Sequence, residues 1–197
     1  MQFVLDILAY LERGGPLMGP ILLVSLVLWC LILCQLRQIW RVSRREAGLA
    51  EALAAIQGRE PLAKLAGTPL CRLVDQFVRT RGEKRQDNAA LLKTLVAREE
   101  AYLGRYISYI FVLATIAPLL GLLGTVLGMI STFDVISVFG TGNPRALANG
   151  ISEALITTQS GLFVSIPGLF MAGFLRRRVA RIGQRLDEFK AGVLQVL

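Results

Sequence analysis

The stretch "YISYIFVLATIAPLLGLLGTVLGMISTF" (residues 106–133) contains no Asp, Glu, Lys or Arg. A helix of about 20 apolar residues is long enough to cross a hydrocarbon core about 30 Å thick. Two further runs approach or exceed that length, "LMGPILLVSLVLWCLILCQL" (17–36) and "ISEALITTQSGLFVSIPGLFMAGFL" (151–175). With 54% hydrophobic residues in a chain of 197, an ordinary soluble domain is excluded. The sequence therefore predicts an all-α membrane protein with three transmembrane helices.

The basic residues predict the orientation of these helices. Of the 22 Lys and Arg residues, 14 lie in 37–105 and 6 in 176–197, whereas the other side of the membrane holds only Arg13 and Arg145. Because Lys and Arg concentrate in cytoplasmic segments, the N-terminus is expected to be periplasmic and the C-terminus cytoplasmic. This placement accounts for the net charge of +8, and no nucleic-acid partner is expected.

Helical periodicity continues beyond the spans. The pattern in "AALLKTLVAREEAYLGRY" (89–106) runs into the second span, and Asp87 or Asn88 is the expected N-cap. The spans should therefore carry long cytoplasmic helical extensions. The predicted segments are, in chain order, a short periplasmic N-terminus (1–16), the first span (17–36), a cytoplasmic helical domain (37–105), the second span (106–139, continuous with a helix from about residue 87), a periplasmic turn (140–150), the third span (151–175) and a cytoplasmic C-terminal helix (176–197).

Small and weakly polar residues follow one face of the second span. They recur in steps of three and four and are Pro118, Gly121, Thr125, Gly128 and Thr132. Such a face is a packing surface for neighbouring helices or part of a polar path, and the spacing alone favours packing.

A polar stripe marks the third span. Asn149, Glu153, Thr157 and Ser160 fall within about 80° at about 100° per residue, and Thr158 and Ser165 flank them on one side. Because an ionisable group inside a span usually faces a pore or a partner, Glu153 is a candidate site residue; the alternative is that it lies close enough to the outer turn to be solvated.

At the end of the third span, a basic cluster should meet the anionic lipids of the inner leaflet and anchor the span. Its members are Arg176, Arg177, Arg178 and Arg181.

Missing residue types limit the chemistry. The chain has no His and three Cys without a CxxC or Cys/His cluster, so His-based catalysis and a Cys/His metal site are excluded. Neither a metal nor a cofactor is expected, and the chain is not expected to be an enzyme.

The segments "APLLGLLGTVLGMISTF" (117–133) and "GISEALITTQSGLFVSIPGL" (150–169) together resemble the paired span motifs of the MotA/TolQ/ExbB proton-channel family, in its ExbB/TolQ branch. The resemblance implies a homopentamer in the bacterial inner membrane whose second and third spans line a pore. It also implies that the pore holds the helices of an ExbD/TolR-like dimer with a protonatable Asp, and that a TonB-like protein is a further partner.

Carried over by position, the family's pore threonines correspond to Thr125 and Thr158, and its pore glutamate to Glu153. Thr157 and Ser160 are added as pore-lining candidates. The chain departs from the family's Ala-Thr-Ala, since it has Thr157, Thr158 and Gln159 at those positions, which makes the pore more polar.

The resemblance implies an ExbB-like subunit of a motor that is driven by the proton-motive force and energises TonB-dependent outer-membrane transport. A TolQ-like subunit for envelope maintenance is the alternative within the family. A passive scaffold in the membrane is the alternative outside it, although a scaffold leaves the polar stripe unexplained. An ion current that requires a co-expressed partner separates the motor from the scaffold.

Overall fold

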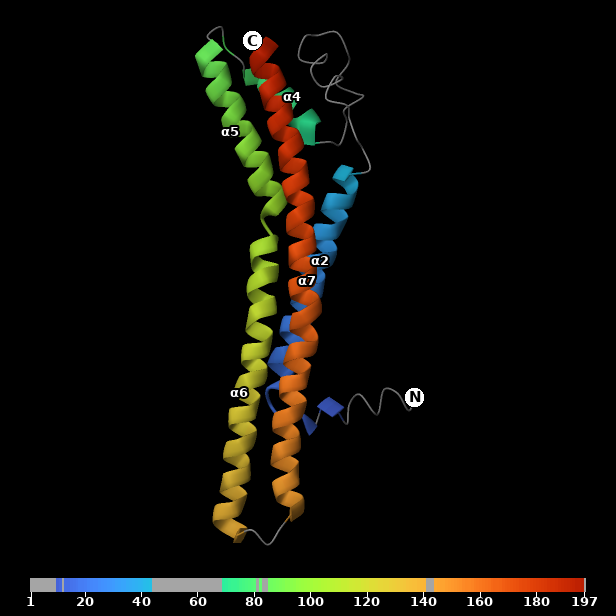
Figure 1. Cartoon of the computed structure of the whole chain (residues 1–197), viewed down its shortest axis with the longest axis vertical. Helices are drawn as coiled ribbons and strands as arrows, with labels where there is room; N and C mark the ends of the chain where they lie inside the picture. The colour runs from blue at the N-terminus through green and yellow to red at the C-terminus, as the bar shows by residue number, and fades with distance from the viewer. Residues whose placement is uncertain are drawn as a thin grey trace. The chain divides into compact units, whose positions relative to one another are not determined.

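The structure is a computed structural model, and it describes residues 10–11, 13–43, 69–80, 82, 85–140 and 144–196. All regular structure in these residues is helical (Figure 1). The helices are α2 (Met18–Ser43), α4 (Pro69–Thr80), α5 (Arg85–Gly104), α6 (Ile107–Phe139) and α7 (Pro144–Val196). Three segments are long and apolar enough to cross a membrane, within Met18–Val42, Asp87–Phe139 and Leu147–Gln195, which confirms the predicted class. The part of the predicted cytoplasmic domain in 44–68 lies outside the described residues.

The helices are shared between two compact units. The span unit consists of Met1–Ile32 and Tyr109–Ala172, and the extension unit consists of Leu33–Ser108 and Gly173–Leu197. Helix α7 contributes to both, since one helix covers the third apolar run and the stretch to Val196. The sequence predicts this continuation from the helical pattern that follows the third span.

In the span unit, α6 and α7 run antiparallel and meet through small residues (Figure 1). A Cβ placed on Gly121 would lie 3.1 Å from Thr158 Cα, and one on Gly128 would lie 2.8 Å from Gly150 O. A Cβ on Gly161 would lie 2.6 Å from the carbonyl oxygen of Ala117. The two backbones therefore approach so closely that only glycine fits at several positions, as is common between membrane helices.

The predicted small-residue face partly coincides with this contact. Gly121, Gly128 and Thr132 are buried, and a Cβ on Gly150 of α7 would collide with the Thr132 hydroxyl. Pro118 is only half-buried, whereas Gly124, which the spacing leaves out, is buried against Thr157. Helix α2 joins the pair at Gly168, where a Cβ would lie 2.8 Å from a Leu28 methyl group.

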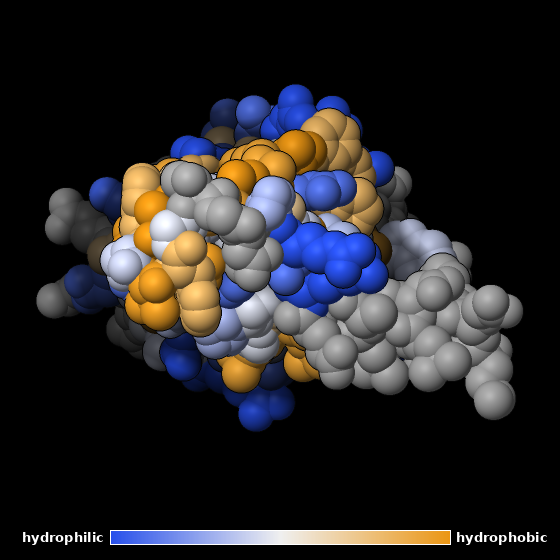
Figure 2. Space-filling view, turned by 90° about the horizontal axis from the view of Figure 1, so that it is seen from below, coloured by the Kyte–Doolittle hydropathy of each residue, from blue (hydrophilic) through white to orange (hydrophobic). Residues whose placement is uncertain are grey.

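Much of the span unit's apolar surface is exposed. Phe163 is 80% exposed and Leu26 is 72% exposed, and the end-on view shows apolar side chains at the surface beside polar ones (Figure 2). Exposed apolar area on this scale requires lipid or other protein around it. These exposed apolar side chains are what the composition predicts for helices that lie in a membrane.

The extension unit has a conventional apolar core built by α4, α5 and α7. Phe77, Leu92 and Phe189, one from each helix, are 0% exposed. At the edge of this core Arg72 of α4 pairs with Glu99 of α5, with Nη2 and Oε2 2.9 Å apart. Helix α4 lies within 37–105, the segment for which the sequence predicts a helical domain.

The helix predicted to run unbroken from about residue 87 is interrupted. Arg105 and Tyr106 form a turn between α5 and α6. Gly104 precedes this turn and weakens the helix, and the Arg105 guanidinium lies over the Tyr102 and Tyr106 rings at 4.8 and 4.3 Å. The Arg105 side chain thus links the last turn of α5 to the turn residue Tyr106.

Helix α2 supplies donors to the carbonyls before the break. Gln35 is fully buried and its Nε2 donates to the Leu103 carbonyl, while Gln38 Nε2 lies 3.5 Å from the Tyr102 carbonyl. These amides donate to carbonyls in the last turn of α5, where the carbonyls of a helix have no backbone donors within the helix.

The start of α5 also differs from the sequence prediction. The helix begins at Arg85, two residues before Asp87. Asn88 is not its N-cap; instead its side-chain oxygen accepts from Gly82 N (2.8 Å) and its amide donates to Gly82 O (2.9 Å). This paired bond closes the chain onto α5 and explains why the side chain is buried.

The close contact of α6 and α7 predicts opposite effects for one substitution at two glycines of α7. Gly161→Ala should lower the free energy of unfolding by about 1–3 kcal/mol, because the new methyl group would meet the Ala117 carbonyl. Gly173→Ala is the control, since nothing lies within 4 Å of its Cβ position, and it should be neutral or stabilising by up to about 1 kcal/mol because Gly weakens a helix. Thermal unfolding of the detergent-solubilised protein measures both, and equal shifts would contradict the close contact.

Candidate functional site

Thr158 joins α7 to α6 in the middle of the span unit. Its Oγ1 lies 3.1 Å from the Gly121 carbonyl of α6 and 3.0 Å from the Ala154 carbonyl of its own helix. The single hydroxyl proton is therefore shared between two acceptors, one on each helix. The side chain is half-buried, so it stands at the edge of the contact and not in its centre.

Thr125 lies near Thr158 on the neighbouring helix. It follows Gly124, which packs against Thr157, and its Oγ1 donates to the Leu122 carbonyl at 2.7 Å. Helical geometry at about 100° per residue places Thr125 and Thr158 on the same side of the α6 and α7 pair. No hydrogen bond joins the two hydroxyls in the part of the chain that is described. The carried-over threonines are thus at similar depth, each with lone pairs available as acceptors.

Thr157 has a different environment from Thr158. It is 1% exposed and its Oγ1 lies 2.9 Å from the Glu153 carbonyl and 3.0 Å from the Ala154 carbonyl. A Cβ on Gly124 would collide with this hydroxyl. Thr157 therefore fills the contact between α6 and α7, and its hydroxyl is satisfied by its own helix.

Glu153 faces the segment that precedes α2. Gly15 has a φ of +68°, and a Cβ there would collide with the Glu153 carboxylate. The neighbouring Gly14 packs in the same way on Met18, with Ile156 of α7 close by. Among the described residues none forms a hydrogen bond or ion pair with the carboxylate. The carboxylate is thus half-buried against a glycine turn.

Ser160 lies on the same side as Glu153. Its Oγ is 3.5 Å from the Tyr10 hydroxyl, and Tyr10 also precedes α2. Asn149, the first residue of the predicted stripe, is exposed. The predicted stripe is therefore divided: Glu153 and Ser160 contact the N-terminal segment, Thr157 is buried, and Thr158 points to the opposite side with Thr125.

Two parts of this arrangement are absent from the sequence interpretation. The turn at Gly14 and Gly15 had a signal in "RGGP" (13–16), since paired glycines before an apolar run permit a left-handed turn and close approach. Ser165 is buried and only 3% exposed. Its place beside the stripe is the only sequence signal for this burial.

The basic cluster lies directly after the buried Leu175. Arg176, Arg177, Arg178 and Arg181 are all exposed, and the Arg178 guanidinium lies 5.4 Å from the centre of the Phe174 ring.

Within the described ranges, no group of three or more Cys, Asp or Glu residues is placed to hold a metal ion.

Comparisons with known proteins identify the family. The model of the MotA/TolQ/ExbB proton channel family matches residues 57–188. The biopolymer transport protein ExbB of Neisseria meningitidis is 28% identical over 89% of this chain and 90% of the relative. The putative biopolymer transport protein ExbB-like 3 of Synechocystis is 30% identical over 83% of this chain and 81% of its own length.

The ExbB of Salmonella typhimurium is 27% identical over 88% of this chain and 77% of that protein. These matches extend well beyond the two span motifs, and they agree with three apolar helices in an all-helical chain. The chain belongs to the MotA/TolQ/ExbB proton channel family.

Proposed function

We propose that this chain is an ExbB-like subunit of a motor that is driven by the proton-motive force in the bacterial inner membrane. With an ExbD-like partner and a TonB-like protein, it energises TonB-dependent transport across the outer membrane. Family membership and the similarity to proteins named ExbB support this proposal. The observation that carries it is the pair of half-buried hydroxyls, Thr125 and Thr158, at similar depth on one side of the α6 and α7 pair.

Threonine can order water and relay hydrogen bonds, but it does not titrate near neutral pH, so this pair cannot store a proton. Between residues 107 and 164 the only carboxylates are Asp134 and Glu153, and Glu153 contacts the N-terminal segment on the other side of the helix pair. A proton path past the threonines therefore needs a titrating group from another chain. The protonatable Asp of an ExbD-like dimer inside a ring of these subunits meets that need.

Glu153 has a separate role in this proposal. It lies five residues nearer the α6 and α7 turn than Thr158, or about 7–8 Å along the helix. It does not line the path, because it lies on the other side of the helix pair, and its negative charge attracts cations toward that end of the path through space. Each proton that then crosses contributes about 2.3 kcal/mol per 100 mV of membrane potential.

The proposal predicts a closed ring, expected to contain five copies of the chain. The exposed apolar side chains need lipid or protein around them, and a ring would turn the Thr125 and Thr158 sides of several copies toward one central partner. Native mass spectrometry in mild detergent should report a pentamer. A stable monomer with full partner-dependent proton flux would contradict the proposal.

Thr158→Val should leave the ring assembled and reduce partner-dependent proton flux at least tenfold. Valine keeps the shape but cannot share a proton with the Gly121 carbonyl. Thr115→Val is the matched control, because the Thr115 hydroxyl bonds only carbonyls of its own helix, at Phe111 and Val112, and it should retain flux. The measurement is acidification of proteoliposomes that contain this chain with and without the partner.

Glu153→Gln, measured in the same assay, should reduce flux severalfold without loss of the ring, since the amide occupies the same space against Gly15. The opposite result, with normal flux in Thr158→Val and failed assembly in Glu153→Gln, would show that the glutamate is structural and that the hydroxyl pair only packs.

The orientation can be tested by labelling single cysteines in a variant that lacks Cys30, Cys34 and Cys71. Ser137→Cys places an exposed thiol near the end of α6, and Gln195→Cys places one near the end of α7. A membrane-impermeant maleimide should label residue 137 in intact spheroplasts and residue 195 only after permeabilisation. The reverse pattern would overturn the orientation that the basic residues predict.

A further inference from the structure

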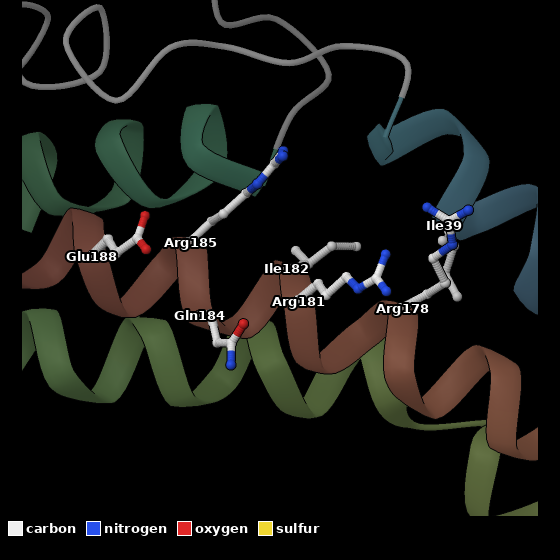
Figure 3. A pocket seen from close by; sticks show the side chains of 7 residues that line it. All are labelled: Ile39, Arg178, Arg181, Ile182, Gln184, Arg185 and Glu188. Atoms are coloured by element: carbon white, nitrogen blue, oxygen red, sulfur yellow. The ribbon is translucent and has the colours of Figure 1, made fainter.

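A groove of about 330 Å³ in the extension unit gathers positive charge (Figure 3). Its polar lining comes from α7 and includes Arg178, Arg181, Arg185 and Glu188, while Ile39 of α2 closes one end. Even without Arg185, two guanidinium groups, those of Arg178 and Arg181, face one carboxylate. The groove therefore carries a net positive charge.

The spacing along α7 brings the arginines together. Residues 178, 181 and 185 fall within about 60° of the helix circumference, so their charges repel one another on one face. Two of them, Arg178 and Arg181, extend toward the end of the groove where Ile39 lies, and Glu188 lies at the other end (Figure 3). The carboxylate is thus poorly placed to neutralise this pair.

No ion pair neutralises Arg178 or Arg181 among the residues that the structure describes. The guanidinium group of Arg178 is positioned by its contact with the Phe174 ring, with Cζ 5.4 Å from the ring centre. Such positioning lowers the conformational entropy that an arginine loses when its guanidinium binds an anion. An external anion would therefore meet two unneutralised guanidinium groups, of which that of Arg178 is already positioned by an aromatic ring.

The groove lies where two apolar segments end. On α7 the basic cluster begins at Arg176, immediately after Leu175, and on α2 the last residue of the apolar run is Leu36, three residues before Ile39. Trp40, the residue after Ile39, is 60% exposed, and tryptophan is enriched at the membrane interface. At this depth the anions are the phosphates of lipid headgroups.

We propose that this groove binds the phosphate of an anionic phospholipid, held by Arg178 and Arg181. Guanidinium groups suit this ligand because their planar forks bind phosphate oxygens in pairs. The acyl chains then lie along the exposed apolar residues of α2 that precede Ile39, such as Leu33, which is 54% exposed. The inference concerns lipid recognition and holds whether or not the chain drives a motor.

The test compares two double variants of the full-length protein that remove the same charge. R178Q/R181Q changes the groove, whereas R176Q/R177Q changes neighbours that do not line it. Native mass spectrometry with added phosphatidylglycerol measures the lipid retained per chain. Wild type and R176Q/R177Q should retain it alike, and R178Q/R181Q should retain at least fivefold less. Equal loss in both variants would show general charge attraction and overturn the site.

Further arms identify the ligand and guard against misfolding. Phosphatidylcholine, which has a phosphate but no net charge, should be retained several times less than phosphatidylglycerol; equal retention would overturn the preference for an anionic lipid. Glycerol phosphate should not displace the bound lipid, and full displacement would make a free anion the ligand. R178K/R181K keeps the charge without the fork and should bind several times less than wild type. Wild-type retention there would overturn paired recognition even if the Gln variant fails to fold.

Discussion

The close backbone approach of α6 and α7 is the constraint on which the span unit depends. At Gly161 and Gly128 a single methyl group would meet a backbone carbonyl of the partner helix. In a lipid environment helices gain little from apolar burial against each other, so close packing and hydrogen bonds between helices must hold them together. The glycines permit both, because the Thr158 hydroxyl reaches the Gly121 carbonyl only when the helices are this near.

This constraint also sorts the polar side chains of the spans. Thr157 and Thr132 point into the contact and are satisfied by carbonyls of their own helices, at Ala154 and Gly128. Thr125 and Thr158 stand at its edge, and Glu153 stands on the other side against Gly15. These polar residues therefore have three different environments. The environment of each residue depends on its position relative to the glycines of the helix contact.

Hydropathy and periodicity are sufficient to predict the three spans and the continuation of α7 to Val196, because a long apolar run in a membrane has few alternatives to a helix. The interruption at Arg105 and Tyr106 follows a local signal, Gly104, but the amides of α2 that donate to the carbonyls before it lie far away in sequence and are not predictable in this way. The contact of Glu153 with Gly15 has the same origin. Periodicity describes one helix at a time, whereas these features arise between segments.

The division of polar groups also has a consequence for proton transfer. A carboxylate placed beside the threonines of its own chain would have to be desolvated or paired whenever the path lacked a partner, at a cost of a few kcal/mol. Thr125 and Thr158 avoid that cost, because hydroxyls bonded to backbone carbonyls are stable in an apolar setting with or without water. A chain built in this way is stable while the path is empty. In the proposed motor, the titrating group, and with it the control of flux, would therefore come from the partner that enters the path.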